Sequence, residues 1–471
     1  MPTSTSRPGP RLASWIAGAL VLTTCSMLLS ATLPERRIVY VSPITAPAGM
    51  SPEDVRLAPT PLDIRAAFRS AVQRVDSATV AGGEALPPIP WGRHGLANVP
   101  LDLDARRWDP LRSRYIVDLE GGRVAVLTLH GPLQQHMERT LAQYREPGQA
   151  AVVIEPSTGR VLAMADLTRD DALPADLARR ANAWAASVFK VITGAALLLD
   201  GHIDPQHRTC FAGGGSGFTM AQLHENAARD TDCVTFTQAM GRSANIVFGR
   251  LALRHLTPGR LTEVAERFGF NVRIPFELPV DVSRVFLPEE PLEFARAAAG
   301  FRYSTLSPLH GALMQAAIAN EGVMMVPTLV ERIEDRSGQV VYEHNPTVWR
   351  VALPRDVSRM VRETQTTTCV TGTARSYFAQ RRGWPTDIDA WGKTGTLANR
   401  RIDGTQPDPY FLQTWFTGVG RLGDRELAAA GLVHNTPTWW IRGSFLASEA
   451  LLQGLRMTTA LDVAGAPGGD P

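Results

Sequence analysis

Two lysines stand out in this sequence because almost every other basic residue is arginine. Of the 48 lysine and arginine residues, 46 are arginine, and the two lysines are Lys190 and Lys393. Arginine serves wherever a permanent surface cation is needed, whereas a buried lysine can lose its proton. We therefore expect the amines of Lys190 and Lys393 to do chemistry that a guanidinium group cannot do.

The first lysine closes the motif Ser187-Val-Phe-Lys190, which places a hydroxyl three residues before an amine. On a helix these two residues share a face, so their side chains can meet. The apolar residues around Lys190 predict a buried helix, where desolvation lowers the pKa of an ammonium group, and a nearby Lys393 would lower it further. A neutral Lys190 can act as general base for a Ser187 nucleophile. Alone, this spacing is more typical of an exposed helix pair.

A second motif, Ser243-Ala-Asn245, lies 56 residues after Ser187. The hydroxyl of Ser243 can relay a proton, and the amide of Asn245 can hold a substrate peptide group. Taken alone, Ser-Ala-Asn is most often a helix cap or a turn.

The second lysine opens a third motif, Lys393-Thr-Gly395, followed by Thr396. On an exposed strand, Lys393, Thr394 and Thr396 provide donors for a carboxylate, and Gly395 allows a close backbone approach. Alone, this motif is typical of a strand end. Because the only two lysines fall in the first and third motifs, the three motifs together predict one catalytic site.

The elements that must position these motifs follow from the pattern of apolar residues. Residues 150–165 read as two strands around a Pro-Ser-Thr-Gly turn, helical patterns dominate residues 185–320, and a closing helix is predicted over residues 445–455. Further strands are predicted over residues 328–343, 388–396, 413–421 and 426–433. Strands at both ends with helices between predict an α/β sandwich whose sheet joins the first hairpin to the last strands.

The region before this sandwich is proline-rich and reads as a linker or small pedestal. It contains a predicted hairpin around Gly121-Gly122 and an amphipathic helix from Leu133 to Tyr144. The sequence thus predicts five parts: a cytoplasmic tail (1–11), a transmembrane anchor (12–34), a linker or pedestal region (35–147), a catalytic domain (148–455) and a disordered tail (456–471).

The predicted anchor is an uncharged stretch of 23 residues, 12–34, long enough as a helix to span a bilayer. A cleaved signal peptide is the rival interpretation, although Leu29 stands where a small residue would be wanted before a cut after Ala31. A lipoprotein site at Cys25 is a third interpretation. Thr24 argues against it, because Gly, Ala or Ser is expected directly before a lipoprotein cysteine. All three place the bulk of the chain outside the cytoplasm.

The composition bears on the class of partner, and the cysteine spacing bears on a disulfide. A net charge of +2 with 20% charged residues gives no reason to expect nucleic acid as a partner. Cys210 and Cys233 can close a loop in an oxidising compartment, adding about 3 kcal/mol of stability, or remain two unpaired thiols.

The three motifs together resemble the Ser-x-x-Lys, Ser-x-Asn and Lys-Thr-Gly set of penicillin-binding proteins and serine β-lactamases. Residues 152–165, the helix segment from Ser307, Val370-Thr-Gly-Thr-Ala and Thr414-Trp-Phe-Thr-Gly are similar to the penicillin-binding transpeptidase family more narrowly. The resemblance covers about residues 148–455.

This resemblance implies a penicillin-binding/β-lactamase-like sandwich: an antiparallel sheet with helices on both faces and an all-helical subdomain, preceded by the anchor and a small α+β pedestal. It implies a peptidoglycan D,D-transpeptidase in which Ser187 attacks the D-Ala-D-Ala amide, with backbone N–H groups of Ser187 and Thr396 as oxyanion hole. Catalysis would fall to Ser187, Lys190 and Ser243, and substrate binding to Asn245, Lys393, Thr394, Gly395 and Thr396.

The implied partners are peptidoglycan stem peptides, β-lactams, the membrane through residues 12–34, and other cell-wall synthesis proteins. No nucleic acid, metal or organic cofactor is expected. His224-Glu225 begins like a zinc motif, but Ala228 stands where its second histidine should be. The implied location is the bacterial cytoplasmic membrane, crossed once, with the catalytic domain in the periplasm.

Alternatives remain open. A D,D-carboxypeptidase would use water as acceptor, and a β-lactamase or a non-catalytic penicillin-binding scaffold would share the fold. Class D β-lactamases carry Val where Asn245 stands, and the complete polar set argues against a scaffold. Residues 1–147 resemble no glycosyltransferase domain, so a monofunctional enzyme is expected. Gly300-Phe-Arg302 departs from the Gly-Gln-Gly of many relatives, which puts the shape of the pocket rim in doubt.

Overall fold

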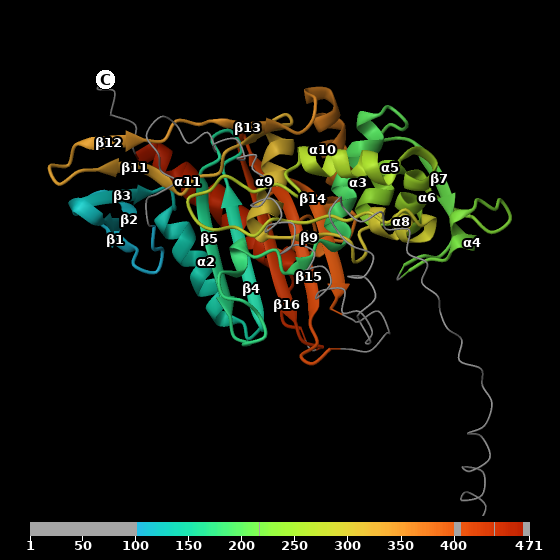
Figure 1. The fold of residues 1–471 in the computed structure, drawn as a ribbon, viewed down its shortest axis with the longest axis horizontal. Coiled ribbons are helices and arrows are strands. Elements are labelled where there is room, and N and C mark those ends of the chain that lie inside the picture. The colour runs from blue at the N-terminus through green and yellow to red at the C-terminus, as the bar shows by residue number, and fades with distance from the viewer. Residues whose placement is uncertain (1–100, 216, 400–406, 438, 465–471) are drawn as a thin grey trace, which may run out of the picture. The chain divides into compact units, whose positions relative to one another are not determined.

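A computed structural model of the chain describes residues 101–215, 217–399, 407–437 and 439–464 (Figure 1). The predicted anchor and cytoplasmic tail, together with residues 35–100 of the predicted pedestal, lie outside the described residues. Within the described ranges, none of the helices combines the length and the apolar character that crossing a bilayer requires.

The central element is a five-stranded antiparallel sheet with the order β14-β15-β16-β4-β5. The last strands of the chain pair with the first hairpin, as predicted: Gly431 of β16 lies opposite Ala151 of β4. The strands are β4 (Gly148–Ile154), β5 (Val161–Thr168), β14 (Ile388–Ala398), β15 (Leu412–Leu422) and β16 (Arg425–Asn435).

Both faces of this sheet are covered, which explains the uninterrupted apolar run of residues 150–154 in β4. Side chains alternate between the two faces of a strand, so Ala150 and Val152 pack in one hydrophobic cluster and Ala151 and Val153 in another. The first cluster includes α9 (Pro308–Ala319), and the second includes α2 (Gly131–Gln143) and α11 (Gly443–Ala464), on opposite faces (Figure 1).

The segment between β5 and α9 is mainly helical, as predicted for the subdomain that carries two of the three motifs. Its elements are η3 (Leu177–Arg179), β6 (Ala183–Trp184), η4 (Ala186–Phe189), α3 (Lys190–Leu199), β7 (Arg208–Phe211), α4 (Met220–Leu223), β8 (Asp232–Thr235), α5 (Phe236–Arg242), α6 (Asn245–His255), α7 (Pro258–Arg267), α8 (Pro291–Ala298) and β9 (Thr305–Leu306).

The subdomain is not entirely helical, because β7 and β8 form a two-stranded antiparallel sheet. Cys210 and Cys233 lie opposite each other in this pair and form a disulfide, so the disulfide interpretation of the sequence is the correct one. Four-residue strands are too short to show a clear apolar period, which is why the sequence analysis missed them.

A second sheet, ordered β1-β2-β3-β11-β12, combines segments from both sides of residue 148. The predicted hairpin around Gly121-Gly122 is present, and β3 pairs with β11 from far along the chain. The strands and short helix are β1 (Arg107–Asp109), β2 (Arg114–Leu119), η2 (Glu120–Gly122), β3 (Arg123–Leu127), β11 (Val330–Glu334) and β12 (Val340–Glu343).

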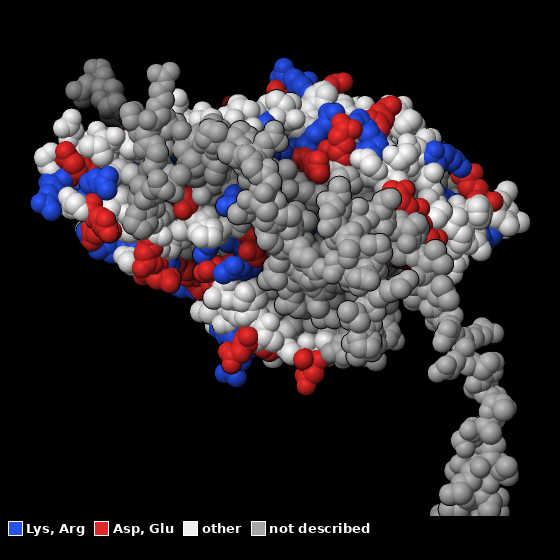
Figure 2. Space-filling view, in the orientation of Figure 1, with Lys and Arg blue, Asp and Glu red and all other residues white. Residues whose placement is uncertain are grey.

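The remaining elements lie between α9 and β14 in the chain. They are β10 (Val323–Met325), β13 (Val348–Val351), α10 (Arg355–Val370) and η5 (Arg375–Tyr377). Two of them, β10 and β13, pair as a two-stranded sheet. The predicted closing helix is present and longer than predicted, since α11 runs from Gly443 to Ala464, while the predicted domain boundaries stay predictions. Figure 2 shows acidic and basic side chains interspersed on the described part of one face, in line with the near-balanced charge.

Candidate active site

Ser187 and Lys190 meet at the start of α3. Ser187 lies in the short helix η4, and the Nζ atom of Lys190 is 2.9 Å from the Oγ atom of Ser187. Ser187 is partly exposed, whereas Lys190 is fully buried. The predicted contact between positions i and i+3 is therefore present, between a partly exposed serine and a lysine shielded from water.

The amine of Lys190 lies among acceptors and apolar groups. Besides Ser187, it contacts Oδ1 of Asn245 at 2.7 Å and the backbone oxygen of Ala299, and it lies 5.5 Å from the ring centre of Phe248. Burial lowers the pKa of Lys190 well below its ordinary value, and the nearby charge of Lys393 lowers it further. A neutral amine can donate to two of its three polar neighbours and accept a hydrogen bond from the hydroxyl of Ser187.

Ser243 and Lys393 form a second pair on the other side of the site. Ser243 ends α5 in the left-handed conformation, with φ of 56°, and its Oγ atom accepts a hydrogen bond of 3.0 Å from Nζ of Lys393. Lys393 also donates to the backbone oxygen of Thr394 at 2.9 Å. Burial lowers the pKa of Lys393 to about 7. Residues 150 positions apart are thus in direct contact.

The strand β14 forms a wall of the site because it is an edge strand of the central sheet. A Cβ atom on Gly395 would lie 3.1 Å from the backbone oxygen of Ala185, so glycine allows β14 to approach the segment that carries Ser187. Thr396 is exposed, and Thr394 shares a hydrogen bond of 2.6 Å with Thr373. Thr373 was not singled out as a site residue, although its segment resembled the family.

Asn245 is the residue that joins the pair of Ser187 and Lys190 to the helical subdomain. Its Oδ1 atom accepts from Lys190, and its Nδ2 atom donates to the backbone oxygens of Gly214 at 3.3 Å and Gly215 at 3.1 Å. The predicted role of Asn245 was to hold a substrate peptide group. In the structure its amide is engaged by the protein at both ends, so its geometry also serves to fix Lys190.

Comparison with known proteins fits this geometry. A family model described as the penicillin binding protein transpeptidase domain matches residues 149–451. The chain belongs to this penicillin-binding protein family. The match covers all eight predicted site residues and the five strands of the central sheet except the first residue of β4.

Several relatives are similar over much of this region. The peptidoglycan D,D-transpeptidase PbpA of Mycolicibacterium smegmatis is 29% identical over 315 residues, which cover 61% of this chain and 62% of that protein. The penicillin-binding protein PbpB of the same organism is 26% identical over 317 residues, 59% of this chain and 47% of PbpB. The chain thus spans less than two thirds of the length of either relative.

Solved structures of penicillin-binding proteins share the fold. The D,D-transpeptidase domain of a peptidoglycan glycosyltransferase from Eggerthella lenta gives a TM-score of 0.60 at 26% identity, covering 74% of this chain and 86% of that one. Penicillin-binding protein 3 of Mycobacterium tuberculosis, solved in complex with aztreonam, gives a TM-score of 0.60 at 22% identity. The match covers 75% of this chain and 82% of that chain.

The segment that departs from many penicillin-binding proteins, Gly300-Phe-Arg302, lies directly against Ser187. Gly300 has φ of 82°, and a Cβ atom there would lie 2.2 Å from the backbone oxygen of Ala186 and 3.0 Å from Cα of Ser187. Phe301 packs edge-on against Phe218, with ring centres 5.9 Å apart. The first position of the triplet therefore requires glycine, while the changed second position is built into a hydrophobic contact.

We expect Gly300→Ala to slow β-lactam acylation by about tenfold or more, because its methyl group would displace the Ser187 backbone. Gly338→Ala is the matched control: its φ is 83°, but no atom lies within 4 Å of the added Cβ. Both variants carry the strain of a positive φ, about 1–2 kcal/mol. Acylation kinetics and melting temperatures measured together separate the two effects, and equal acylation by both variants would contradict the expectation.

Proposed function

We propose that this penicillin-binding protein is a peptidoglycan D,D-transpeptidase that cross-links stem peptides through an acyl-enzyme on Ser187. The observation that carries the proposal is the contact of 2.9 Å between the hydroxyl of Ser187, a partly exposed residue, and the amine of Lys190, a fully buried one. A buried amine of lowered pKa beside a reachable hydroxyl is the arrangement that nucleophilic acyl transfer requires.

Acylation begins when neutral Lys190 accepts the proton of Ser187. The Oγ atom of Ser187 then attacks the carbonyl carbon of the penultimate D-alanine, and the developing oxyanion is held by backbone N–H groups of Ser187 and Thr396. The amide C–N bond breaks, and D-alanine leaves with a proton returned through Lys190 and Ser243. The same pair of residues then deprotonates the amine of a neighbouring stem peptide, which attacks the ester and releases Ser187.

The β14 side of the site would hold the terminal carboxylate. We assign this role to Lys393, Thr394 and Thr396, with Gly395 keeping the strand close to the nucleophile. While Lys393 is protonated, its charge attracts the carboxylate and also helps to keep Lys190 neutral. The carboxylate of a β-lactam would occupy the same place, which makes Ser187 the residue that β-lactams acylate.

The pKa of Lys393, about 7, predicts how substrate affinity depends on pH. Because a lysine is charged below its pKa, the affinity of a Ser187→Ala variant for a β-lactam carboxylate should be highest below pH 7. Above this value it should fall, approaching about tenfold per pH unit. Fluorescence anisotropy of a labelled penicillin gives this profile.

The matched control for this profile is Lys393→Arg in the same Ser187→Ala background. A guanidinium group stays charged throughout the range, so this variant should show no loss of affinity above pH 7. Two results would show that Lys393 does not hold the carboxylate: an affinity that does not change with pH in the Ser187→Ala variant, or an affinity that falls equally steeply when Lys393 is replaced by arginine.

One experiment separates the proposed function from its alternatives. The full-length protein in detergent is incubated with a stem pentapeptide and an amine acceptor, and the products are identified by mass spectrometry. Cross-linked product with release of D-alanine supports a transpeptidase, whereas hydrolysed product alone indicates a carboxypeptidase. A parallel sample receives penicillin in place of the pentapeptide. Rapid turnover of penicillin without a lasting adduct would indicate a β-lactamase, and no reaction with either the pentapeptide or penicillin would indicate a scaffold.

We further propose that the protein is anchored in the bacterial cytoplasmic membrane through residues 12–34, with the domain of residues 148–455 in the periplasm. The disulfide between Cys210 and Cys233 supports an oxidising compartment. Other cell-wall synthesis proteins are the proposed partners there. Labelling of the domain by a membrane-impermeant reagent in intact spheroplasts tests this placement, and protection of the domain would contradict it.

A further inference from the structure

The catalytic lysine is fixed by Asn245, and Asn245 is fixed by a chain segment that has little rigidity of its own. The segment runs from Cys210 to Gly215 and presents two backbone oxygens to the amide of Asn245. Gly213 and Gly214 both have positive φ, of 73° and 78°. Consecutive glycines lose more conformational freedom on folding than other residues, so this segment needs anchors to hold its carbonyl groups in place.

Arg250 supplies an anchor from the same helix that carries Asn245. Its Nη1 atom donates to the backbone oxygen of Cys210 at 2.7 Å, at the start of the segment. Gly214, near the other end, lies so close to Ile246 that a Cβ atom would be 2.3 Å from its Cγ1 atom. The segment therefore lies along α6, from Arg250 to Asn245, over roughly 7.5 Å of helix.

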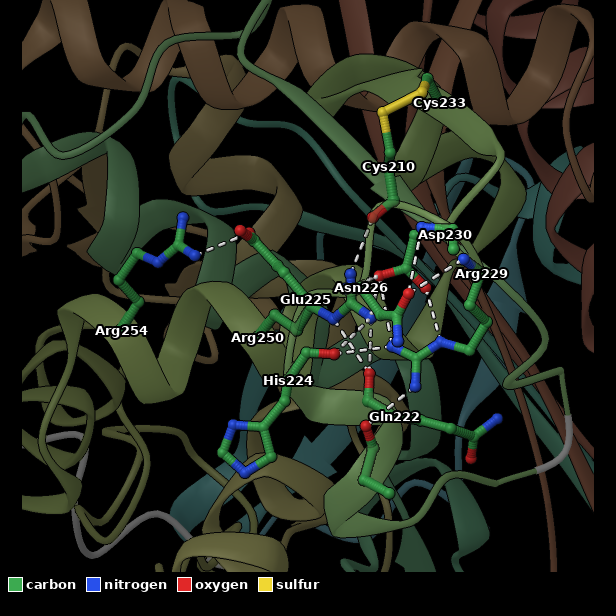
Figure 3. Close-up of polar contacts among 12 residues, drawn as sticks. Cys210, Gln222, His224, Glu225, Asn226, Arg229, Asp230, Cys233, Arg250 and Arg254 are labelled. Atoms are coloured by element: carbon green, nitrogen blue, oxygen red, sulfur yellow. Dashed lines mark hydrogen bonds and ion pairs between the residues drawn. A yellow bond between two sulfur atoms is a disulfide. The ribbon is translucent and has the colours of Figure 1, made fainter.

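Arg250 is itself held in a buried polar cluster (Figure 3). Its guanidinium donates to the backbone oxygens of Gln222 and His224 and to the carboxylate of Asp230, at 2.8 Å. The side chains of Arg250 and Asp230 are only 3% and 4% exposed. A planar guanidinium with five donors can hold several acceptors at fixed angles, which lysine cannot do. These contacts tie α6 to the Cys210 strand and to the loop that follows α4.

The disulfide between Cys210 and Cys233 is the second anchor (Figure 3). It joins the first residue of the glycine segment to β8, which leads directly into α5 and Ser243. Asn245, which fixes Lys190, and Ser243, which contacts Lys393, are therefore both connected to Cys210 through covalent or buried contacts.

We propose that Arg250, together with the disulfide, is a positioning element for acylation: it holds the carbonyl groups of Gly214 and Gly215 against Asn245, and through Asn245 it holds Lys190 against Ser187. Arg250 touches none of the reacting groups. The inference rests on the proposed function, since it concerns the acylation step. The buried ion pair of Arg250 and Asp230 would then contribute to the rate of acylation as well as to the stability of the fold.

The test measures the two parts of β-lactam acylation separately in the full-length protein: the dissociation constant of the non-covalent complex and the first-order acylation constant. The test variant is Arg250→Met, which removes the cation while the carboxylate of Asp230 keeps its ion pair of 2.8 Å with Arg229. We expect the acylation constant to fall between about 10-fold and 100-fold, since small displacements of a catalytic group have such effects. The dissociation constant should change by less than about twofold.

The control variant is Arg254→Ala, on the same helix and in the same view. Arg254 pairs with Glu225 on the surface, where both side chains are about half exposed. We expect its acylation constant to stay within about twofold of the wild type. Melting temperatures of both variants show whether each is folded. A folded test variant with wild-type acylation, or equal losses in the two variants, would overturn the inference.

A second arm uses the unmutated chain, so its result stands even when the Arg250 variant does not fold. Excess dithiothreitol releases the thiols of Cys210 and Cys233, and we expect acylation of the wild type to slow by about tenfold. A Cys210→Ser/Cys233→Ser variant keeps Cys25 and Cys369, and dithiothreitol should leave its rate unchanged. Unchanged acylation after complete reduction would overturn the role of the disulfide. A wild type that never forms an adduct would overturn the proposed function itself.

Discussion

Replacing Ser187 with alanine should abolish the covalent penicillin adduct and lower D-alanine release by more than about a thousandfold. No other group can take over, because the step requires a hydroxyl beside a neutral amine, and removal of a nucleophile from such a unit eliminates most of its rate enhancement. The change removes the one oxygen atom of Ser187 that lies 2.9 Å from Nζ of Lys190, and the contacts of Lys190 with Asn245 and Ala299 remain. The variant should therefore fold and still bind penicillin without covalent attachment.

The informative control for this result is Ser243→Ala. Its hydroxyl accepts from Lys393, and its proposed task is to return a proton to the leaving group and not to attack the carbonyl, so this variant should form the adduct more slowly but still at Ser187. Fluorescent penicillin on denaturing gels gives the rates, and mass spectrometry of the labelled peptide identifies the residue. An adduct that persists in the Ser187→Ala variant, or one that maps to Ser243, would refute the assignment of the nucleophile.

The contact between Ser187 and Lys190 could be predicted from the sequence because the information there is local. Ser187 and Lys190 are separated by one helical turn, and the scarcity of lysine marked both amines as special. The central sheet was predictable for a similar reason, since its strands have long apolar runs and strong turn signals at both ends. The joining of the first hairpin to the last strands followed from the need to cover a buried sheet on both faces.

The contacts that depend on topology were beyond the reach of spacing and composition. Lys393 reaches Ser243 across 150 positions, and only the pairing of β14 at the sheet edge brings them together. Arg250 was hidden for a related reason: in a chain with 46 arginines, nothing in the sequence distinguishes one buried guanidinium from the many on the surface. The disulfide could be suggested from its glycine-rich setting, but the choice between paired and free thiols needed the short strands that bring the two cysteines together.

Replacing Lys190 with arginine should slow acylation by about a hundredfold to ten-thousandfold, the contribution typical of a positioned general base. The substitution keeps a long cationic side chain with donors for Asn245 and Ala299, so the polar contacts of the site are partly retained. What it removes is the neutral form, because a guanidinium group does not release its proton in a protein. The burial that lowers the pKa of Lys190 cannot create a base from arginine.

Lys393→Arg is the matched control, since it makes the same chemical change at the only other lysine. Lys393 is equally buried, but its proposed task is to present a positive charge to a carboxylate, and arginine also provides that charge. We therefore expect a much smaller loss of acylation in Lys393→Arg than in Lys190→Arg when both are measured by stopped-flow with the same β-lactam and both melt near the wild-type temperature. Equal losses would mean that the site requires the smaller volume of lysine at both positions, and near-normal acylation by Lys190→Arg would show that this amine is not the base. A large loss confined to Lys190→Arg is the result that the burial of its amine and its contact with Ser187 require.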